Sequence, residues 1–329
     1  MADRLLVTVV IPMRNEEQFI IPCLDSLLAN TIAGPIEFLV YDGESSDRSV
    51  ELVEQLAAVD SRIALVRNPR RIQAAAFNDA IGRARGEFFL RADAHSLYPV
   101  NYISECVRLL TETGASNVGG VVHAVGRDTF SSAVAMAVGS RFAVGDAKYR
   151  VATEPGWVET VFPGAWRTAT LRDLGGMRED WKVNEDAEMN LRLREAGGRI
   201  FLTPTLRPMY FVRSSVTGLI RQYARYGFWR TRTLLSHPRS LKWRQLVAPT
   251  FVLSIAAAWP LTARLGISGA AHLILYVAVN LGVSVATAAR SSWQYLPLLP
   301  LIFLIVHVAW GAGFLAGLCY WPLRRRAVA

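Results

Sequence analysis

An acid and an imidazole stand two residues apart in the stretch LRADAHS, residues 90–96. In an extended segment the side chains of Asp93 and His95 would point to the same side and could face one cleft. Each can bind a divalent cation: Mg²⁺ would rely mainly on the carboxylate and on substrate phosphates, whereas a histidine ligand favours Mn²⁺ without deciding the choice. The pattern alone does not establish a metal site, because a solvated acid followed by a histidine is common in loops.

Two further acidic stretches could take part in chemistry. Asp42, in YDGESSD, could accept a hydrogen bond from a base N–H or a ribose hydroxyl, or could simply begin an Asp-Gly turn. The stretch NEDAEMNLRLREAGG, residues 184–198, begins with polar residues where a helix is predicted to start. Acids there complement the helix dipole, and one of them would also suit a general base that accepts a proton from a hydroxyl nucleophile.

A basic stretch, RQYARYGFWR at residues 221–230, carries the opposite charge. Arg221 and Arg225 lie one helical turn apart, so two guanidinium groups on one face could hold a phosphate or a diphosphate. A solvated basic face against anionic lipid explains the charge equally well.

The elements that must position these residues alternate between strands and helices along the first half of the chain. Such alternation predicts an α/β fold with a mostly parallel sheet and helices on both faces. Ligands of these sheets bind beyond the carboxyl ends of the strands. The predicted strands are 5–11, 36–41, 63–66 and 87–92, and the predicted helices are 16–29, 46–58 and 72–84.

Polar residues follow three of the predicted strands. Because the carboxyl ends of parallel strands meet at one edge of a sheet, we expect the three groups to converge. The groups are Pro12, Arg14, Asn15 and Glu16 after the first strand, Asp42 after the second, and Asp93 with His95 after the fourth.

Charge is divided unevenly along the chain. All 27 acidic residues lie at or before Glu195, whereas 15 of the 36 Lys and Arg residues follow it. Residues 1–195 therefore carry a net charge of −6 and residues 196–329 carry +15, which agrees with the overall +9. A tail that is basic, apolar and free of acids suits a membrane and an anionic partner, and it is too hydrophobic for a nucleic-acid-binding arm.

The tail also carries membrane signals. Residues 215–235 mix aromatic residues with arginines and predict an amphipathic helix at a membrane surface. Three apolar stretches follow, at 246–263, 268–289 and 296–321, each close to or above the roughly 20 residues that cross a bilayer. Three spans would put the C-terminal arginines outside, against the positive-inside tendency, so one stretch could re-enter instead and the number of spans stays open.

The cysteines and the N-terminal region indicate a compartment. Cys23, Cys106 and Cys319 are odd in number and far apart, which favours a reducing compartment over a disulfide framework or a zinc site. The first apolar run is too short for a secretory signal, so the first half is expected in the cytoplasm.

Taken together, these stretches resemble glycosyltransferase family 2, whose catalytic domain has the GT-A fold. The resemblance covers residues 5–235 and is greatest to bacterial exopolysaccharide enzymes of the succinoglycan glucosyltransferase type, which share the D-A-H pattern and an R-Q-Y-x-R-Y-G run before apolar helices. The matching stretches are VVIPMRNEE (9–17), YDGESSDRS (41–49), AFNDAIGRARGEF (76–88), RADAH (91–95), FPGAWR (162–167), NEDAEMNLRLREAGG (184–198) and QYARYG (222–227).

The resemblance implies roles for individual residues. Asp93 would bind a Mn²⁺ or Mg²⁺ ion that bridges the phosphates of a UDP-sugar, with His95 as the second ligand. Asp186 would be the catalytic base, with Glu185 beside it in the acceptor site. The nucleotide-sugar pocket would be lined by Pro12, Asn15, Glu16, Asp42, Arg71, Asn78, Ala92 and Asp93. The diphosphate or the acceptor would be bound by Trp166, Arg221, Gln222, Arg225 and Tyr226.

The implied architecture is a GT-A-type, Rossmann-like mixed sheet over residues 1–212, amphipathic interface helices over 213–245 and transmembrane helices over 246–329. The enzyme would transfer a sugar, by resemblance glucose, with inversion to a membrane-anchored polyprenyl-diphosphate saccharide in exopolysaccharide synthesis. It would lie in the bacterial inner membrane with its catalytic domain in the cytoplasm, and no nucleic-acid partner is expected. His95 in place of an acid leaves the metal open, and Tyr226 in place of Trp argues against processive synthases.

Two alternatives stay open. A polyprenyl monophosphate acceptor would already be an anion and would need no base. A non-catalytic membrane binding or transport protein is the alternative from another class. For that protein, His272 and His307 could hint at a relay, although isolated packed histidines are more common.

Overall fold

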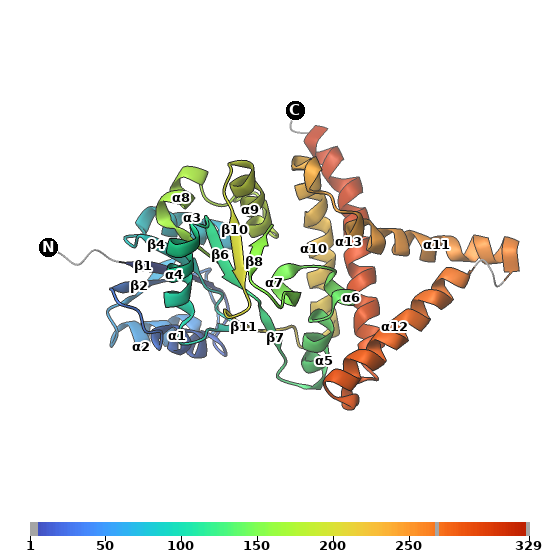
Figure 1. Ribbon diagram of the computed structural model, residues 1–329, viewed down its shortest axis with the longest axis horizontal. Coiled ribbons are helices and arrows are strands. Elements are labelled where there is room, and N and C mark those ends of the chain that lie inside the picture. Colours follow the sequence, from blue (N-terminus) through green and yellow to red (C-terminus); the bar gives the residue numbers. More distant parts are fainter. Residues whose placement is uncertain (1–5, 267–269, 327–329) are drawn as a thin grey trace. The chain divides into compact units, whose positions relative to one another are not determined.

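The computed structural model describes residues 6–266 and 270–326, which form two compact units. Unit 1 comprises the residues up to 123 together with 147–210, and unit 2 comprises 124–146 together with the residues from 211 onward. Figure 1 shows the sheet of unit 1 and the long helices of unit 2. The predicted strand start at residue 5 and the predicted span start at residue 268 lie outside the described residues.

Unit 1 is built on an eight-stranded mixed sheet of order β3-β2-β1-β4-β9-β6-β10-β8. Strands β3, β2, β1 and β4 run parallel, β9 is antiparallel to both β4 and β6, and β8 is an antiparallel edge strand beside β10. The strands are β1 (Val7–Met13), β2 (Ile36–Asp42), β3 (Ile63–Arg67), β4 (Phe88–Arg91), β6 (Asn117–Gly120), β8 (Gly156–Val158), β9 (Gly164–Arg167) and β10 (Ile200–Thr203).

Helices cover both faces of this sheet. Successive side chains of a strand point to opposite faces, so Val9 packs into the layer of α1 and α4 while Val10 packs into the layer of α3 and α9. All of β1 is buried, as suits a central parallel strand. The predicted α/β sheet flanked by helices is confirmed. The helices are α1 (Ile20–Leu28), α2 (Ser49–Ala57), α3 (Gln73–Arg83), α4 (Tyr102–Thr113), α7 (Lys148–Val151), α8 (Thr168–Leu174) and α9 (Glu185–Glu195), and two short strands, β5 (Ser96–Leu97) and β11 (Met209–Phe211), pair antiparallel.

Unit 2 is helical, and its longest helices, α10 and α13, pack side by side (Figure 1). Glycines allow their backbones to approach closely: a Cβ on Gly313 would lie 2.0 Å from the Ala224 carbonyl oxygen, and a Cβ on Gly227 would lie 2.0 Å from that of Trp310. The helices are α5 (Thr129–Val138), α6 (Arg141–Val144), α10 (Val216–Ser236), α11 (Val247–Leu265), α12 (Ala271–Arg290) and α13 (Leu299–Arg326), with 3-10 turns η1 (Pro238–Ser240), η2 (Trp243–Leu246) and η4 (Trp293–Tyr295).

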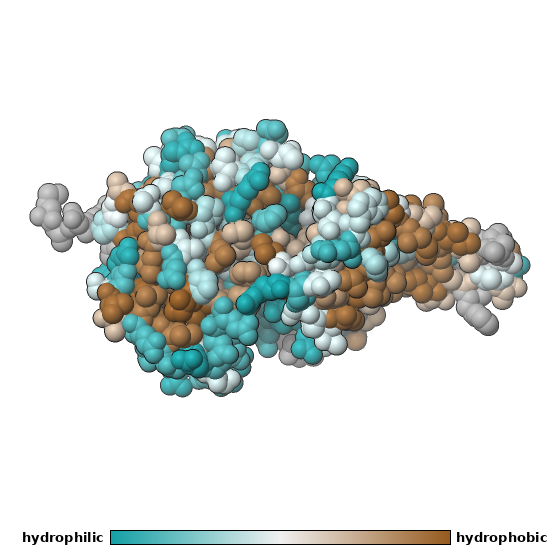
Figure 2. Space-filling model, turned by 90° about the horizontal axis from the view of Figure 1, so that it is seen from below, coloured by the Kyte–Doolittle hydropathy of each residue, from teal (hydrophilic) through white to brown (hydrophobic). Residues whose placement is uncertain are grey.

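Each of the three apolar stretches forms a helix, but among the described residues only α12 and α13 are long and apolar enough to cross a membrane. The first stretch becomes α11, which contains Pro260 and ends with Arg264 in its last turn. Figure 2 shows hydrophobic side chains gathered on the surface of this helical part, and the exposed residues there include Leu253, Ile274, Leu275 and Val277.

Residues 124–146 were predicted within the catalytic domain but belong to the compact core of unit 2. On α5, Ala133, Ala137 and Val138 are buried in one cluster with Ile302 and Phe303 of α13. The apolar residues of α5 predict that the helix is buried, but they do not show in which of the two units it is buried.

Candidate active site

The tips of β1 and β2 are bonded to each other. Met13 lies beside Asp42 in the register, and the Gly43 N–H donates to the Met13 carbonyl at 2.9 Å. The Asn15 carboxamide oxygen accepts from the Ser46 N–H at 2.8 Å. Asp42 is buried and accepts from the Ser45 N–H at 3.1 Å, so its carboxylate is held at the end of the strand, as predicted from the sequence.

The tip of β4 differs from the expectation. The segment from Asp93 to Ser96 is a turn closed by a 3.1 Å hydrogen bond from the Ser96 N–H to the Asp93 carbonyl, so the predicted extended segment is wrong. His95 nevertheless reaches the tip of β1, because its Nδ1 lies 3.1 Å from Oε1 of Glu16. Asp93 is buried, and its N–H donates to the Tyr98 hydroxyl. The fourth strand tip thus meets the first.

Arg91, the last residue of β4, joins this turn to α9. Its side chain is only 4% exposed, with Nε 3.1 Å from the Asp93 carboxylate and a terminal nitrogen 3.4 Å from that of Glu185. Its other terminal nitrogen donates to Gln73 at 3.0 Å, and the ring of Phe162 lies against the guanidinium. The sequence reasoning missed this residue, although an arginine inside an apolar strand was a signal that a buried countercharge exists.

The acids of the Asn-Glu-Asp stretch stand at the start of α9. Burial raises the pKa of both Glu185 and Asp186, Arg91 partly offsets this, and a neighbouring carboxylate raises each pKa further. A carboxylate with a raised pKa is a stronger base, so it accepts a proton from a hydroxyl group more readily near neutral pH. The pKa of both acids is thus shifted in the direction expected of a general base.

Backbone strain gathers around these same segments. Among the described residues, the non-glycine residues with positive φ are Asn15, Glu44, Arg71 and Asn184, with φ of 57°, 58°, 56° and 61°. Arg71 forms an ion pair with Glu44, beyond the tip of β2, and Asn184 precedes the acid pair. Such strain persists only where surrounding structure enforces it, and it is frequent at functional sites.

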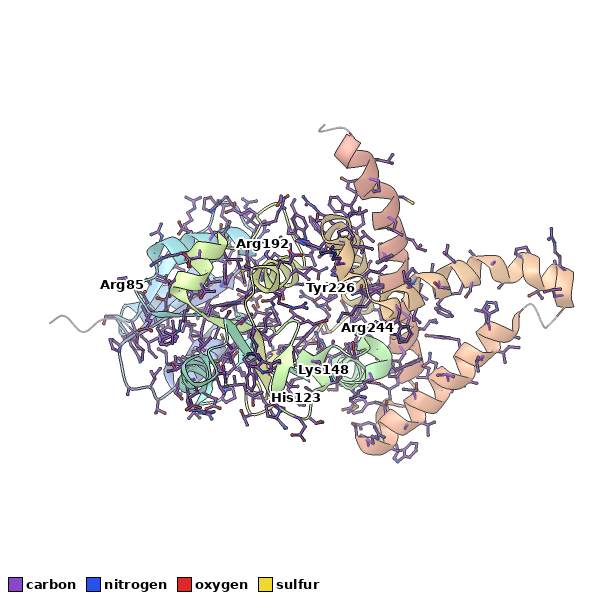
Figure 3. All side chains as sticks on the ribbon, turned by 45° about the horizontal axis from the view of Figure 1, so that its top comes forward. Arg85, His123, Lys148, Arg192, Tyr226 and Arg244 are labelled. Carbon is purple, nitrogen blue, oxygen red and sulfur yellow. The ribbon has the colours of Figure 1, made fainter. Side chains whose placement is uncertain are left out.

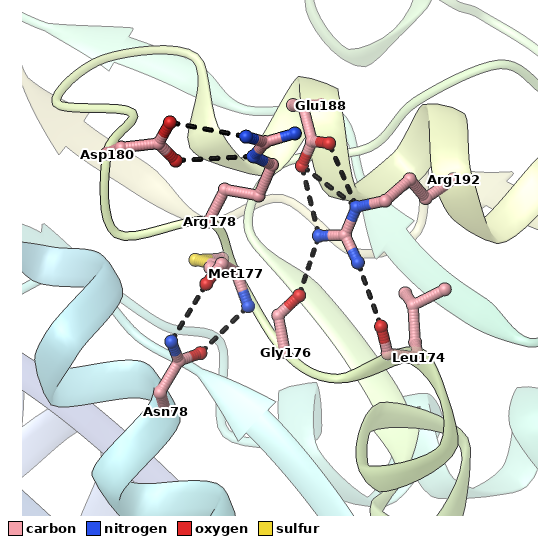
Figure 4. Close-up of polar contacts among 8 residues, drawn as sticks. All are labelled: Asn78, Leu174, Gly176, Met177, Arg178, Asp180, Glu188 and Arg192. Atoms are coloured by element: carbon pink, nitrogen blue, oxygen red, sulfur yellow. Dashed lines mark hydrogen bonds and ion pairs between the residues drawn. The ribbon is translucent and has the colours of Figure 1, made fainter. Parts of the chain in front are cut away.

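A buried network fixes the loop that leads into α9 (Figure 4). Glu188 is fully buried and pairs with Arg192 at 2.9 Å; Arg192 also donates to the carbonyls of Leu174 at 2.9 Å and Gly176 at 2.7 Å. Asn78 exchanges two 2.8 Å hydrogen bonds with the main chain of Met177. Its carboxamide thus anchors this loop, and its predicted place in the nucleotide pocket stays a prediction.

The remaining predicted residues are spread over both units. Pro12 lies in buried β1, and Ala92 is buried with its N–H bonded to the Val10 carbonyl at 2.9 Å. Trp166 packs edge-on against Phe77, with no hydrogen-bond partner for its indole N–H among the described residues. Unit 2 holds the rest on α10, where Tyr226 (labelled in Figure 3) accepts from Gln222 at 3.0 Å and the exposed arginines are Arg221 and Arg225.

The residues present fit a cation that takes most of its ligands from a substrate. Within the described ranges, no group of three or more His, Cys, Asp or Glu side chains is arranged to hold a metal ion. Asp93 and His95 would be the two protein ligands, and the Glu16 carboxylate beside Nδ1 of His95 would favour the tautomer in which Nε2 coordinates. Mg²⁺ and Mn²⁺ are commonly bound through one or two protein ligands plus phosphate oxygens.

The chain is similar in sequence to known proteins. The sequence profile described as Glycosyl transferase family 2 matches residues 8–166. The chain is 32% identical over 308 residues to the succinoglycan biosynthesis protein ExoA of Rhizobium meliloti (strain 1021), covering 93% of each chain. It is 26% identical over 230 residues to a dolichyl N-acetyl-α-D-glucosaminyl phosphate 3-β-D-2,3-diacetamido-2,3-dideoxy-β-D-glucuronosyltransferase of Methanococcus voltae, covering 67% of this chain and 71% of the other.

Among solved structures, the fold is similar to that of the mannosyltransferase PcManGT from Pyrobaculum calidifontis in complex with GDP-Man and Mn²⁺. The TM-score is 0.63 at 20% identity, and the match covers 94% of this chain and 88% of the other. At this identity the similarity establishes the fold alone.

Proposed function

Because this chain belongs to the family 2 glycosyltransferases, we propose that it transfers a sugar from a UDP-sugar to a membrane-anchored polyprenyl-diphosphate saccharide. The succinoglycan relative supports a role in exopolysaccharide synthesis and, through the resemblance, glucose as the sugar. The Methanococcus relative is named for transfer to a sugar on a dolichyl phosphate, which supports a lipid-linked sugar hydroxyl as the acceptor.

The observation that carries this proposal is the meeting of Arg91, Asp93 and Glu185 in unit 1, with Asp186 the next residue of α9. A donor diphosphate at the strand tips would lie beside Asp93 and His95. A divalent cation bound there would supply positive charge against the leaving diphosphate. Asn15, Glu16, Asp42 and Arg71 would bind the nucleoside, with Asp42 facing the base.

Asp186 would act as the base in a single displacement. It accepts the proton of the acceptor hydroxyl while that oxygen bonds to the anomeric carbon, and the bond from that carbon to the phosphate oxygen breaks. UDP leaves, and configuration at the anomeric carbon inverts. Glu185, held by Arg91, would lie in the acceptor site, and the α10 residues Arg221, Gln222, Arg225 and Tyr226 would bind the diphosphate or the acceptor.

The membrane placement follows from charge. With α12 and α13 as the two spans, the C-terminal arginines return to the side of the residues before α12. The positive-inside tendency then puts that side, and with it the catalytic domain, in the cytoplasm of a bacterial inner membrane. Protease protection of a C-terminal tag in inside-out and right-side-out vesicles tests this orientation.

The decisive test of the chemistry is Asp186→Asn in the full-length protein. Transfer from UDP-glucose to lipid-linked saccharide, followed by mass analysis of lipid products, should fall by about 10²–10⁴-fold, the usual contribution of a general base. Asp173→Asn, at an exposed position on α8, serves as the matched control and should keep wild-type transfer.

The same experiment separates the rival acceptor. A polyprenyl monophosphate needs no base, so wild-type transfer by Asp186→Asn with an acid-labile lipid-phosphate sugar as product would replace the present proposal by that one. A non-catalytic protein is excluded by family membership. The position of His307 is explained without a proton relay, because its ring hydrogen-bonds the Phe142 carbonyl at 2.7 Å and the Tyr276 hydroxyl at 3.0 Å.

A further inference from the structure

Two buried side chains fix the main chain of Asp93. The Asp93 N–H donates to the Tyr98 hydroxyl at 2.7 Å, and the Cys23 thiol donates to the Asp93 carbonyl at 3.4 Å. Tyr98 is 5% exposed and Cys23 is fully buried. Burial raises the pKa of the Cys23 thiol, so the sulfur keeps the proton that it donates. Both polar groups of the Asp93 main chain are therefore bonded to side chains of the core.

These two side chains are also linked to each other through α1. The Tyr98 N–H donates to the Ser26 hydroxyl oxygen at 3.1 Å, and that hydroxyl donates to the Cys23 carbonyl at 2.7 Å. Ser26 and Cys23 lie on α1, so the bonds tie that helix to the tip of β4. The four residues form a closed ring of hydrogen bonds, which we call the Asp93 clamp: Asp93, Tyr98, Ser26 and Cys23.

The carboxylate of Asp93 is held separately from its main chain. Arg91 Nε lies 3.1 Å from Oδ1 of Asp93. A cation bound at Asp93 would share this carboxylate with the guanidinium, so its affinity depends on the direction in which the carboxylate points. Once the main chain is fixed, an aspartate side chain can turn about two bonds only, and its rotamers are few. A fixed main chain therefore limits the directions that the carboxylate can take.

We infer that Tyr98 and Cys23 are positioning residues of the donor site, which hold the Asp93 carboxylate in the direction that a divalent cation requires. This inference rests on the proposed function, in which Asp93 binds the cation together with a UDP-sugar. Groups that orient a metal ligand typically change metal affinity by about 10–100-fold. Because the Asp93 clamp acts through the main chain and not on the carboxylate itself, we expect the lower end of this range.

The chain offers a matched control for each of the two residues. Tyr102 lies beside Tyr98, with ring centroids 4.9 Å apart, and its hydroxyl forms no hydrogen bond with the turn at Asp93. Cys106, on α4, is fully buried in the same core cluster as Cys23. Removal of either control group deletes a buried hydroxyl or thiol from this core and leaves the Asp93 clamp intact.

The experiment measures the uptake of Mn²⁺ by the full-length protein in detergent with saturating UDP, from the electron paramagnetic resonance signal of free Mn²⁺. Tyr98→Phe should raise the dissociation constant of Mn²⁺ about tenfold. Cys23→Ala should raise it less, because a thiol is a weak donor. Tyr102→Phe and Cys106→Ala should keep the wild-type constant.

Transfer from UDP-glucose provides a second readout. Tyr98→Phe should need more Mn²⁺ for half-maximal rate, by the same factor of about ten, while kcat at saturating Mn²⁺ changes less. A residue that serves stability alone would not shift the Mn²⁺ requirement. Thermal unfolding of all four variants shows which of them are folded.

Equal dissociation constants of Mn²⁺ for Tyr98→Phe and Tyr102→Phe would overturn the inference, even if both variants unfold at a lower temperature. Should Tyr98→Phe not fold, Cys23→Ala is compared with Cys106→Ala, and equal constants for that pair overturn the inference as well. Failure of the proposed function gives a different result, because the wild-type protein itself would then take up no Mn²⁺ with UDP.

Discussion

Two largely buried arginines, Arg91 in unit 1 and Arg230 in unit 2, have opposite electrostatic surroundings. Burial by itself lowers the pKa of both, but Asp93, Glu185 and Asp186 raise the pKa of Arg91 above its ordinary value. Arg230 hydrogen-bonds neutral oxygens, so burial lowers its pKa to about 10. Arg91 is thus the positive partner of several carboxylates. Arg230 instead holds the turn after α10 through hydrogen bonds, and no negative charge offsets the cost of burying it.

The comparison predicts its largest effect at Arg91. Arg91→Met keeps the volume but leaves buried carboxylates without their countercharge, so we expect a loss of about 3–5 kcal/mol in the free energy of unfolding. Transfer should also be lost, because Asp93 and Glu185 no longer have a common partner. Thermal unfolding in detergent and a donor-transfer assay measure the two effects.

Arg91→Lys is the control for charge at this position. A single ammonium cannot match the fork that reaches Asp93, Glu185 and Gln73 together, so it should recover part of the stability and little of the transfer. Wild-type stability and transfer in Arg91→Met would show that the buried guanidinium does not organise the site.

We expect a smaller loss of catalytic rate when the ion pair between Glu188 and Arg192 is broken. This pair lies on α9, the helix that begins with Glu185 and Asp186. Glu188→Gln leaves Arg192 without its carboxylate while the carbonyls of Leu174 and Gly176 remain bonded, so the loop should stay folded but move. We expect kcat to fall by about tenfold, equivalent to roughly 1.4 kcal/mol, with little change in donor KM. Arg194→Gln, on the exposed part of the same helix, should change neither parameter. A rise in KM alone would show that the pair serves donor binding instead.

The pH profile provides a third test. Because burial and a neighbouring carboxylate raise the pKa of Asp186, the acid limb of kcat/KM should lie above the ordinary aspartate value of about 3.9. Stability changes with pH in the opposite direction to activity. A carboxyl group whose pKa is higher in the folded than in the unfolded protein favours folding below its unfolded pKa, and that contribution is lost as the pH rises through the folded pKa. An acid limb at or below the ordinary value would remove Asp186 from the role of base.

Much of unit 1 could be predicted because its signals are local. Apolar runs marked the strands, and the rule that ligands gather at strand ends placed Asp42, Asp93 and His95 at their tips. Arg91 escaped notice because its partner Glu185 is 94 residues away, and nothing in a strand pattern says which helix will meet it. The turn at Asp93 was also missed, since two polar residues with alternate spacing fit either an extended or a turned segment.

In unit 2 the local signals were ambiguous. The sequence indicated three apolar helices but could not separate α11 from the two that are apolar enough to span. Gly313 and Gly317 of α13 lie close to the backbone of α10, and a sequence does not show which helix such glycines will meet. That packing buries one face of α10 and leaves Arg221 and Arg225 exposed on the helix.

The smallest effect is predicted for Arg230→Met. This variant loses hydrogen bonds to Ser240 and Gln245 but also removes a largely buried cation whose Nε has no partner among the described residues. Replacing buried charge by an apolar side chain of similar size is often close to neutral, so the free energy of unfolding should change by less than about 1 kcal/mol. Faster hydrogen exchange at residues 237–246, the turn between α10 and α11, should accompany it, because the turn has lost its hydrogen bonds to Arg230. A loss as large as that of Arg91→Met would mean that Arg230 has a carboxylate or a bound anion as its partner in the folded protein, and the contrast between the two arginines would not hold.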